Sequence, residues 1–316
     1  MTRSPEVRKR QAATWSVLSN TVLIVGKLCV WFVTGSVSVL AEACHSCSDL
    51  VGSALALISV RLADTPPDKD HAYGHGKYEN VSGLMIALLV FGVGVVTVYE
   101  AVQRLSVHKP VVSAWLALIM MGISSLCNAA VSSNLLKVGK KTDSPALLAD
   151  GHHLQTDVVA SASVFIGLLL MQLTGFTWID PVAALVVACF IFWISLQIGR
   201  ESLSTLSDAA LPADEVALLT KALVADPRVL SFHKLRTRKA GSHRHIDVHI
   251  QISDTLSFVT AHQISEEVED RLRATLTNVH PIVHMEPYED EVHHQATDHA
   301  ASGEDKLPPE LPGDQS

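Results

Sequence analysis

Six long apolar segments constrain the fold of this chain more than any other feature of its sequence. They cover residues 12–34, 37–62, 81–104, 112–136, 146–173 and 179–199. Each is close to the roughly 20 residues that an α-helix needs to cross the hydrocarbon core of a bilayer. Inside a bilayer the backbone polar groups have no water to bond, so such segments are expected to be helical. The sequence therefore predicts an α-helical membrane protein with six transmembrane helices.

Positively charged residues are distributed unequally among the joints between these segments. They precede the first segment, occupy the joints after the second and fourth, and follow the sixth, whereas the other joints hold little beyond Arg104 and Lys109. By the positive-inside rule this asymmetry predicts cytoplasmic N- and C-termini. Met1–Arg10 has no apolar region of the kind that a signal peptide requires, so no cleaved signal is expected. We assign residues 1–10 to a cytoplasmic N-terminus and residues 11–208 to the six-helix transmembrane domain.

Two of the apolar segments each carry a histidine and an aspartate four residues apart. The pairs are His45 with Asp49 and His153 with Asp157. On an α-helix, residues at this spacing lie about 40° apart around the axis and about 6 Å apart along it, so both can contact one ion. Two helices could therefore present two imidazole nitrogens and two carboxylate oxygens to a shared point. Such a tetrahedral set suits a divalent first-row metal, zinc foremost.

The alternative interpretation is that these residues are ordinary core histidines and helix caps, which is the usual role of a lone histidine in a soluble helix. Ionisable groups at bilayer depth are costly, however, and by default they mark an ion path or a functional pair. The intramembrane position favours a metal site. Lys27, near the middle of the first segment, either extends to the interface or forms an internal ion pair.

The joint after the second apolar segment is dense in metal-ligand residue types. Residues 66–77 contain Asp68, His71 and His75. These side chains could converge in the loop as a second metal site, or they could simply be solvated, as polar loops usually are. The sequence leaves both interpretations open.

From about residue 209 the sequence changes to that of a soluble α+β domain. Charged residues become frequent, and helical and strand periodicities alternate. The helices are expected at 213–225 and 258–276, and the strands at 229–238, 245–252 and 279–285. This α-β-β-α-β order predicts a small sheet with two helices on one face. We assign residues 209–287 to this cytoplasmic, metal-binding domain.

Histidines recur along this domain. On the second strand His245, Asp247 and His249 share a face because side chains alternate along a strand, and His284 shares a face of the last strand with Glu286. A single surface histidine carries no information, but a cluster on paired strands could bind two or more metal ions. The remaining histidines of the domain are His233, His243, His262 and His280.

Residues 288–316 are acidic, rich in Pro and Gly and nearly free of large apolar residues, so a disordered tail is expected. Its three histidines, His293, His294 and His299, could bind metal weakly. The net charge of -8 and the lack of a basic stripe with interleaved aromatic residues argue against nucleic acid as a partner.

All five cysteines fall inside apolar segments, which argues against a disulfide scaffold. Cys44 and Cys47 form a Cys-x-x-Cys pair. On a helix Cys47 points away from His45 and Asp49, so packing is the preferred role of this pair and auxiliary metal ligation the alternative.

With these motifs in view, the chain resembles the cation diffusion facilitator family of six-span efflux transporters for zinc and related divalent ions. The resemblance extends from the first apolar segment to about Pro287. Its most specific parts are the stretches Ala41–Asp49, Asp150–Val158 and His71–Lys77.

The resemblance implies a homodimer with a ferredoxin-like cytoplasmic domain in each protomer, which exports metal from the cytoplasm in exchange for protons. It implies a transport site made of His45, Asp49, His153 and Asp157, and a site in the joint made of Asp68, His71 and His75. The cytoplasmic ligands it implies are His233, His249, His262, His284 and Glu286, where Glu286 replaces the family's Asp. The two-histidine transport site resembles that of zinc-selective members, since a tight imidazole-containing tetrahedron suits zinc better than cadmium or octahedral manganese.

These observations predict a proton-coupled exporter of divalent cations, zinc foremost, that works by alternating access in a lipid bilayer. Zinc would be both cargo and regulator, iron, manganese, cobalt or cadmium are alternative substrates, and a bacterial inner membrane is the expected location. A metal-responsive membrane sensor that does not transport is the alternative in another class. An enzyme is disfavoured because no His-Glu-x-x-His motif occurs. His152, about 100° around the helix from His153, is expected to act as a proton acceptor or gate rather than as a ligand.

Overall fold

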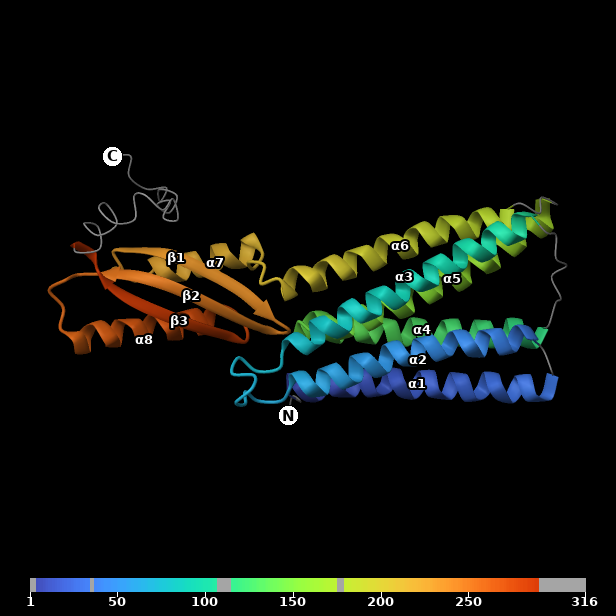
Figure 1. Cartoon of the computed structure of the whole chain (residues 1–316), viewed down its shortest axis with the longest axis horizontal. Coiled ribbons are helices and arrows are strands. Elements are labelled where there is room, and N and C mark those ends of the chain that lie inside the picture. The colour runs from blue at the N-terminus through green and yellow to red at the C-terminus, as the bar shows by residue number, and fades with distance from the viewer. Residues whose placement is uncertain (1–3, 35–36, 107–114, 175–178, 290–316) are drawn as a thin grey trace. The chain divides into compact units, whose positions relative to one another are not determined.

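A computed structural model describes residues 4–34, 37–106, 115–174 and 179–289 of the chain (Figure 1). The chain divides into two compact units, Met1–Leu206 and Ser207–Ser316. The first is built of helices, and the second contains a sheet with helices.

The first unit consists, within the described residues, of six long α-helices. They are α1 (Pro5–Thr34), α2 (Val37–Ala63), α3 (Lys77–Ser106), α4 (Trp115–Thr142), α5 (Pro145–Thr174) and α6 (Ile179–Leu206). Each contains the described part of one predicted apolar segment, and most extend beyond it by a turn or more. Four described stretches are long and apolar enough to cross a membrane: Pro5–Val33, His45–Ala63, Lys77–Gln103 and Val182–Leu206.

The helices of this unit pack in pairs, α1 with α2, α3 with α6 and α4 with α5. Their shared core contains Ala56 of α2, Ile86 of α3 and Leu154 of α5. Small residues allow close approach, because a Cβ at Gly151 of α5 would lie 2.9 Å from Leu136 Cδ2 of α4.

The outer surface of the unit is apolar. Large exposed side chains include Phe32, Leu126 and Trp193. A soluble protein rarely exposes so many large apolar groups, whereas a lipid-facing surface requires them.

The second unit contains α7 (Ala213–Val224), β1 (Ser231–Ala240), β2 (His243–Ile252), α8 (Phe258–Thr275) and β3 (Val279–Pro287). The predicted α-β-β-α-β order is confirmed. The strands form one sheet in the order β1-β2-β3, with β1 and β2 antiparallel and β2 and β3 parallel. The parallel pair requires a crossover, which α8 provides. The side-chain hydroxyl of Ser257 caps α8 by accepting a hydrogen bond from Thr260 N.

Side-chain alternation along β2 gives the sheet two different faces. Ile246, Val248 and Ile250 are buried and belong to one apolar cluster with Leu219 of α7 and Ile264 of α8. Both helices therefore cover the same face of the sheet. The opposite face receives the alternate residues of β2, which are His243, His245, Asp247, His249 and Gln251.

A β-bulge in β1 adjusts which residues of that strand reach the histidine-bearing face. His233 pairs with His249 and Arg236 pairs with Asp247, so β1 carries one more residue than β2 in this interval. Lys234, inside the bulge, has a φ of 49°, in the left-handed region. The bulge sets His233 directly across from His249.

We expect Ile246→Ala to lower the free energy of opening of the soluble unit by about 2–5 kcal/mol, because the side chain is fully buried and its loss leaves a cavity. Hydrogen exchange of the β2 amides in the full-length protein measures this. The matched control is Ile282→Ala on β3, which is 58% exposed and should cost less than about 1 kcal/mol. Equal losses from both variants would contradict the assignment of the core face.

Candidate metal centres

The two intramembrane pairs predicted from the sequence lie together in the structure. α2 carries His45 and Asp49, and α5 carries His153 and Asp157. His45 Nε2 is 3.6 Å from Asp157 Oδ1, and His153 Nε2 is 3.7 Å from Asp49 Oδ1. Ligand atoms of His45, Asp49 and Asp157 all lie within 4.8 Å of one another. These separations fit donors around one small cation.

Several donor atoms of this group are buried and make no hydrogen bond within the described part of the chain. They are Asp49 Oδ1, Asp157 Oδ2 and both ring nitrogens of His153. Asp49 is 3% exposed, Asp157 7% and His153 0%. A buried polar atom without a partner is destabilising, so an apolar interior does not normally retain several of them in one place. A cation bound beside Asp49 would satisfy the two carboxylate oxygens and His153 Nε2, the ring nitrogen that faces Asp49.

A close approach of α2 to α5 holds the His153 ring. Gly52 of α2 faces this ring, and a Cβ built on Gly52 would lie 3.1 Å from His153 Cδ2 and 3.5 Å from Nε2. A larger residue at position 52 would push the imidazole away from Asp49. The lack of a side chain at Gly52 therefore allows the His153 ring to lie next to Asp49.

A buried hydrogen-bond network, which sequence reasoning missed, supports the two helices from α1. Asp150 of α5 accepts hydrogen bonds from Ser16 at 2.8 Å and from Ser53 at 3.0 Å. Asn20 donates to Ser53 at 2.8 Å and to the backbone oxygen of Asp49 at 3.4 Å. The sequence feature that could have revealed this network is the position of Asp150, one helical turn before His153 and on the same face of the helix.

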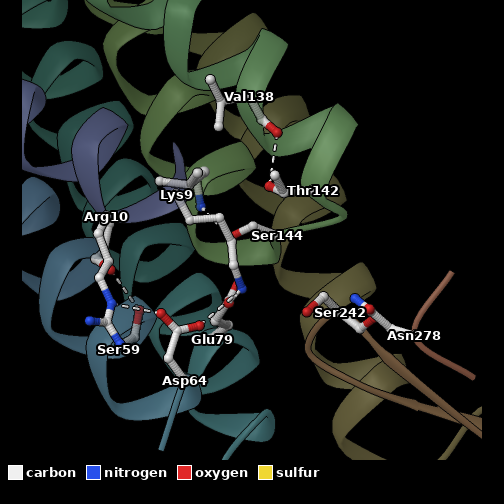
Figure 2. Close-up of polar contacts among 12 residues, drawn as sticks. Lys9, Arg10, Ser59, Asp64, Glu79, Val138, Thr142, Ser144, Ser242 and Asn278 are labelled. Atoms are coloured by element: carbon white, nitrogen blue, oxygen red, sulfur yellow. Dashed lines mark hydrogen bonds and ion pairs between the residues drawn. The ribbon is translucent and has the colours of Figure 1, made fainter. Parts of the chain in front are cut away.

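A second network that the sequence did not reveal joins the ends of several helices (Figure 2). Lys9 of α1 donates to Glu79 of α3 at 2.8 Å and lies 3.6 Å from Asp64, which follows α2. Arg10 also pairs with Asp64, at 2.8 Å. The hydroxyl of Ser144, just before α5, donates to Glu79. Lys9 and Glu79 are both buried, so this network fixes the relative positions of four helices at one end of the unit.

Lys27 is buried inside the helical unit and donates to Ser46 Oγ at 2.7 Å. Its ammonium thus lies beside the residue that follows His45. The half-buried His152 bonds Gln155 Oε1 through Nδ1, at 3.2 Å.

The three residues of the joint after α2 also converge. His75 Nε2 lies 3.3 Å from Asp68 Oδ2, and His71 Nδ1 lies 3.6 Å from Asp68 Oδ1. Backbone hydrogen bonds from His71, and then from Asp70, lower the pKa of Asp68 and keep its carboxylate ionised. Gly74, with a φ of 80°, supplies the turn between the two histidines. The group forms a solvent-exposed candidate site.

A third group lies on the histidine-bearing face of the sheet. Glu286 of β3 accepts from His233 Nε2 at 2.6 Å and from His249 Nδ1 at 2.5 Å, while His284 Nε2 is 3.7 Å away. Partial burial opposes ionisation of Glu286, but the hydrogen bond from His249 and the neighbouring His233 outweigh it and lower its pKa. One carboxylate thus lies against three imidazoles.

Not every predicted ligand joins a group in the described residues. His262 is exposed on α8 and lies 3.6 Å from Glu266, separate from the group around Glu286. Cys47 is exposed. The side chain of Cys44 and the tail histidines His293, His294 and His299 lie outside the described residues.

The helical unit is thus a membrane-spanning unit with a buried group of His and Asp side chains, and its sequence is similar to that of known proteins. A family described as the cation efflux transmembrane domain matches residues 13–207, and one described as the cytoplasmic domain of cation efflux proteins matches residues 211–288. The first match spans more than half of the chain. The chain belongs to the cation diffusion facilitator family, and the resemblance seen in its motifs is confirmed. It is an integral membrane protein of a family that carries out cation efflux.

Individual relatives are similar over nearly their whole length. An uncharacterised transporter of Synechocystis sp. is 32% identical, with 89% of this chain and 92% of that protein aligned. The cation-efflux pump FieF of Pectobacterium carotovorum is 32% identical over 87% of this chain and 92% of the pump, and that of Shewanella oneidensis 31% identical over 87% and 93%. Among solved structures, the Zn form of CzrB is 29% identical and covers 26% of this chain and 93% of its own, with a TM-score of 0.23.

We expect Gly52→Val to weaken divalent-cation binding at the intramembrane group by about tenfold or more, because the added side chain must displace the His153 ring. Metal titration of the purified full-length protein measures this. Gly92→Val is the matched control, since a Cβ at Gly92 meets nothing within 4 Å. Equal affinity of the two variants would show that Gly52 does not position His153.

Proposed function

We propose that this protein exports divalent metal cations, zinc foremost, from the cytoplasm in exchange for protons. His45, Asp49, His153 and Asp157 form the transport site of this proposal. In this proposal the protein acts as a homodimer in a bacterial inner membrane, with both termini and the soluble unit in the cytoplasm. The membrane orientation rests on the distribution of Lys and Arg among the joints.

One observation carries the proposal: a set of nitrogen and oxygen donors lies buried in a membrane unit with several of its atoms unsatisfied. A structural role for these side chains would leave that cost uncompensated. Cation binding compensates it, and membership of an efflux family supplies the direction of movement.

The proposal of zinc rests on the chemistry of the donors. Two imidazoles and two carboxylates form a compact four-donor set, which suits the tetrahedral preference of zinc. Manganese and magnesium prefer octahedral oxygen environments, and cadmium is larger. Iron and cobalt follow zinc as alternative cargoes.

Proton exchange follows from competition for the same nitrogens. An imidazole must be neutral to bind a metal, and the unperturbed pKa of histidine is about 6.5. When the site faces the side of lower pH, protons occupy His45 and His153 and the metal leaves. When it faces the cytoplasm, the protons leave and metal affinity returns. Alternating exposure of the site therefore couples metal export to proton entry.

The groups around Glu286 and Asp68 are proposed as regulatory or structural metal sites rather than steps of the path. Both lie outside the apolar helices, and the group around Asp68 is open to solvent. Metal bound to the soluble unit would report the cytoplasmic concentration and favour the active dimer.

We expect Asp49→Ala and Asp157→Ala each to abolish zinc flux while the protein stays folded, because loss of one of four ligands opens the coordination sphere. Zinc-reporter fluorescence inside proteoliposomes measures the flux. Asp254→Ala, which removes an aspartate of the soluble unit outside the candidate groups, serves as a control and should transport normally. Normal flux in both membrane variants would overturn the transport-site assignment.

His45→Asp should shift selectivity from zinc toward cadmium or manganese, because a hard oxygen replaces a borderline nitrogen and the shorter side chain enlarges the site. The measurement compares flux of the three ions in one proteoliposome preparation. An unchanged ratio of zinc to cadmium flux would place selectivity elsewhere in the protein.

Zinc flux should rise when a pH gradient drives protons against the direction of metal movement, and it should fall when an ionophore collapses that gradient. The apparent affinity for zinc should increase between about pH 6 and 7.5, the window in which histidine loses its proton. Zinc and pH reporters on opposite sides of the liposome membrane test this. Flux that follows membrane potential alone would indicate uniport.

A further inference from the structure

A second group of histidines lies farther along the same face of the sheet. His243 and His245 are two residues apart on β2, so both side chains point to one face. In the parallel pairing of β2 with β3, His280 lies directly beside His245. None of these residues belongs to the group around Glu286.

The ring of His280 contacts the rings of both His243 and His245. His243 Nδ1 lies 3.1 Å from His280 Nε2. The ring centroid of His280 lies 5.2 Å from that of His243 and 5.4 Å from that of His245. Two nitrogens that each bind one zinc ion at about 2.0–2.1 Å with tetrahedral geometry are about 3.3 Å apart. The observed nitrogen separation is close to that value.

Arg238 of β1 lies beside this group, since it pairs with His245 across the antiparallel ladder. Arg238 would repel a cation, but it lies 3.3 Å from the carboxylate of Asp208, which offsets its charge.

The group is separate from the one at the other end of the strand. His245 and His249 are four residues apart, which corresponds to about 13 Å along a β-strand. A single ion cannot bridge that distance. A metal at the first group would therefore be an additional ion on the same sheet.

We propose that His243 and His280, with the ring of His245 beside them, form an additional metal site of the soluble unit, composed of imidazoles alone. Such a site prefers the nitrogen-binding ions Cu²⁺, Ni²⁺, Co²⁺ and Zn²⁺ and discriminates against Mn²⁺ and Mg²⁺, which favour oxygen ligands. Its ligands come from β2 and β3, which are neighbours in space but are connected through α8. A bound ion therefore links the two ends of the crossover and resists separation of the parallel pair. This proposal does not depend on transport activity.

The test uses the full-length protein in detergent, in a background that lacks one ligand of each other proposed centre: Asp49→Ala, Asp68→Ala and His249→Ala. Co²⁺ is the probe, because its absorption spectrum reports the number and type of ligands. We expect this background protein, in which the other proposed centres are disrupted, to bind one Co²⁺ per chain with an imidazole-type spectrum. Adding His280→Gln should weaken that binding by at least 100-fold.

The matched control is His284→Gln in the same background. His284 lies on the same strand and is exposed, so this variant removes a β3 histidine without touching the proposed site. Co²⁺ binding should persist in it. The tail histidines are present in every variant, so their contribution cancels in the comparison.

His243→Gln provides an independent variant, and Zn²⁺ protection of His243 and His280 from acylation, followed by mass spectrometry, localises the ion without any substitution. Equal Co²⁺ binding by the His280→Gln and His284→Gln proteins would overturn the proposal. The proposal would also be overturned if the background protein bound no Co²⁺. The same holds if Zn²⁺ protected neither His243 nor His280 from acylation in the unsubstituted protein.

Discussion

The cost of burying charge in an apolar surrounding is the constraint on which the membrane unit depends. Buried ionisable groups near its helix ends are matched, as in the pair of Lys9 with Glu79. Asp150, deep in the unit, accepts hydrogen bonds from two serine hydroxyls. The group around His153 is different, because several of its ligand atoms make no hydrogen bond within the described residues. The same constraint that forces pairing elsewhere supports the proposal that this group binds a cation.

The parts of the structure that could be predicted from the sequence depend on local spacing. Helix positions follow from apolar runs, and the placement of His153 and Asp157 on one face of α5 follows from a spacing of four. The support from α1 could not be predicted in this way. Ser16 and Asp150 are 134 positions apart, and their contact depends on which helices become neighbours. Nothing in the local pattern of α1 marks Ser16 as different from other small residues.

The soluble unit shows the same division. Alternation along β2 correctly indicated one apolar face and one histidine-bearing face. Which histidines meet depends on strand order and on the parallel register, neither of which is local. His262 illustrates the limit, since its helical position did not reveal that it points to Glu266 rather than to the sheet group. The family resemblance supplied candidate ligands that periodicity alone could not.

The bulge in β1 has a consequence for how this face tolerates changes in chain length. Side chains change face with every residue, so an irregularity of one residue inverts the alternation of everything on one side of it. Deletion of one of the two residues between His233 and Arg236 would restore a regular ladder and leave His233 beside His249. A ladder straightened without a deletion would instead place Lys234 beside His249, with its ammonium next to Glu286 as an internal counter-ion. The bulge, rather than the length of the strand, therefore keeps an imidazole beside this carboxylate.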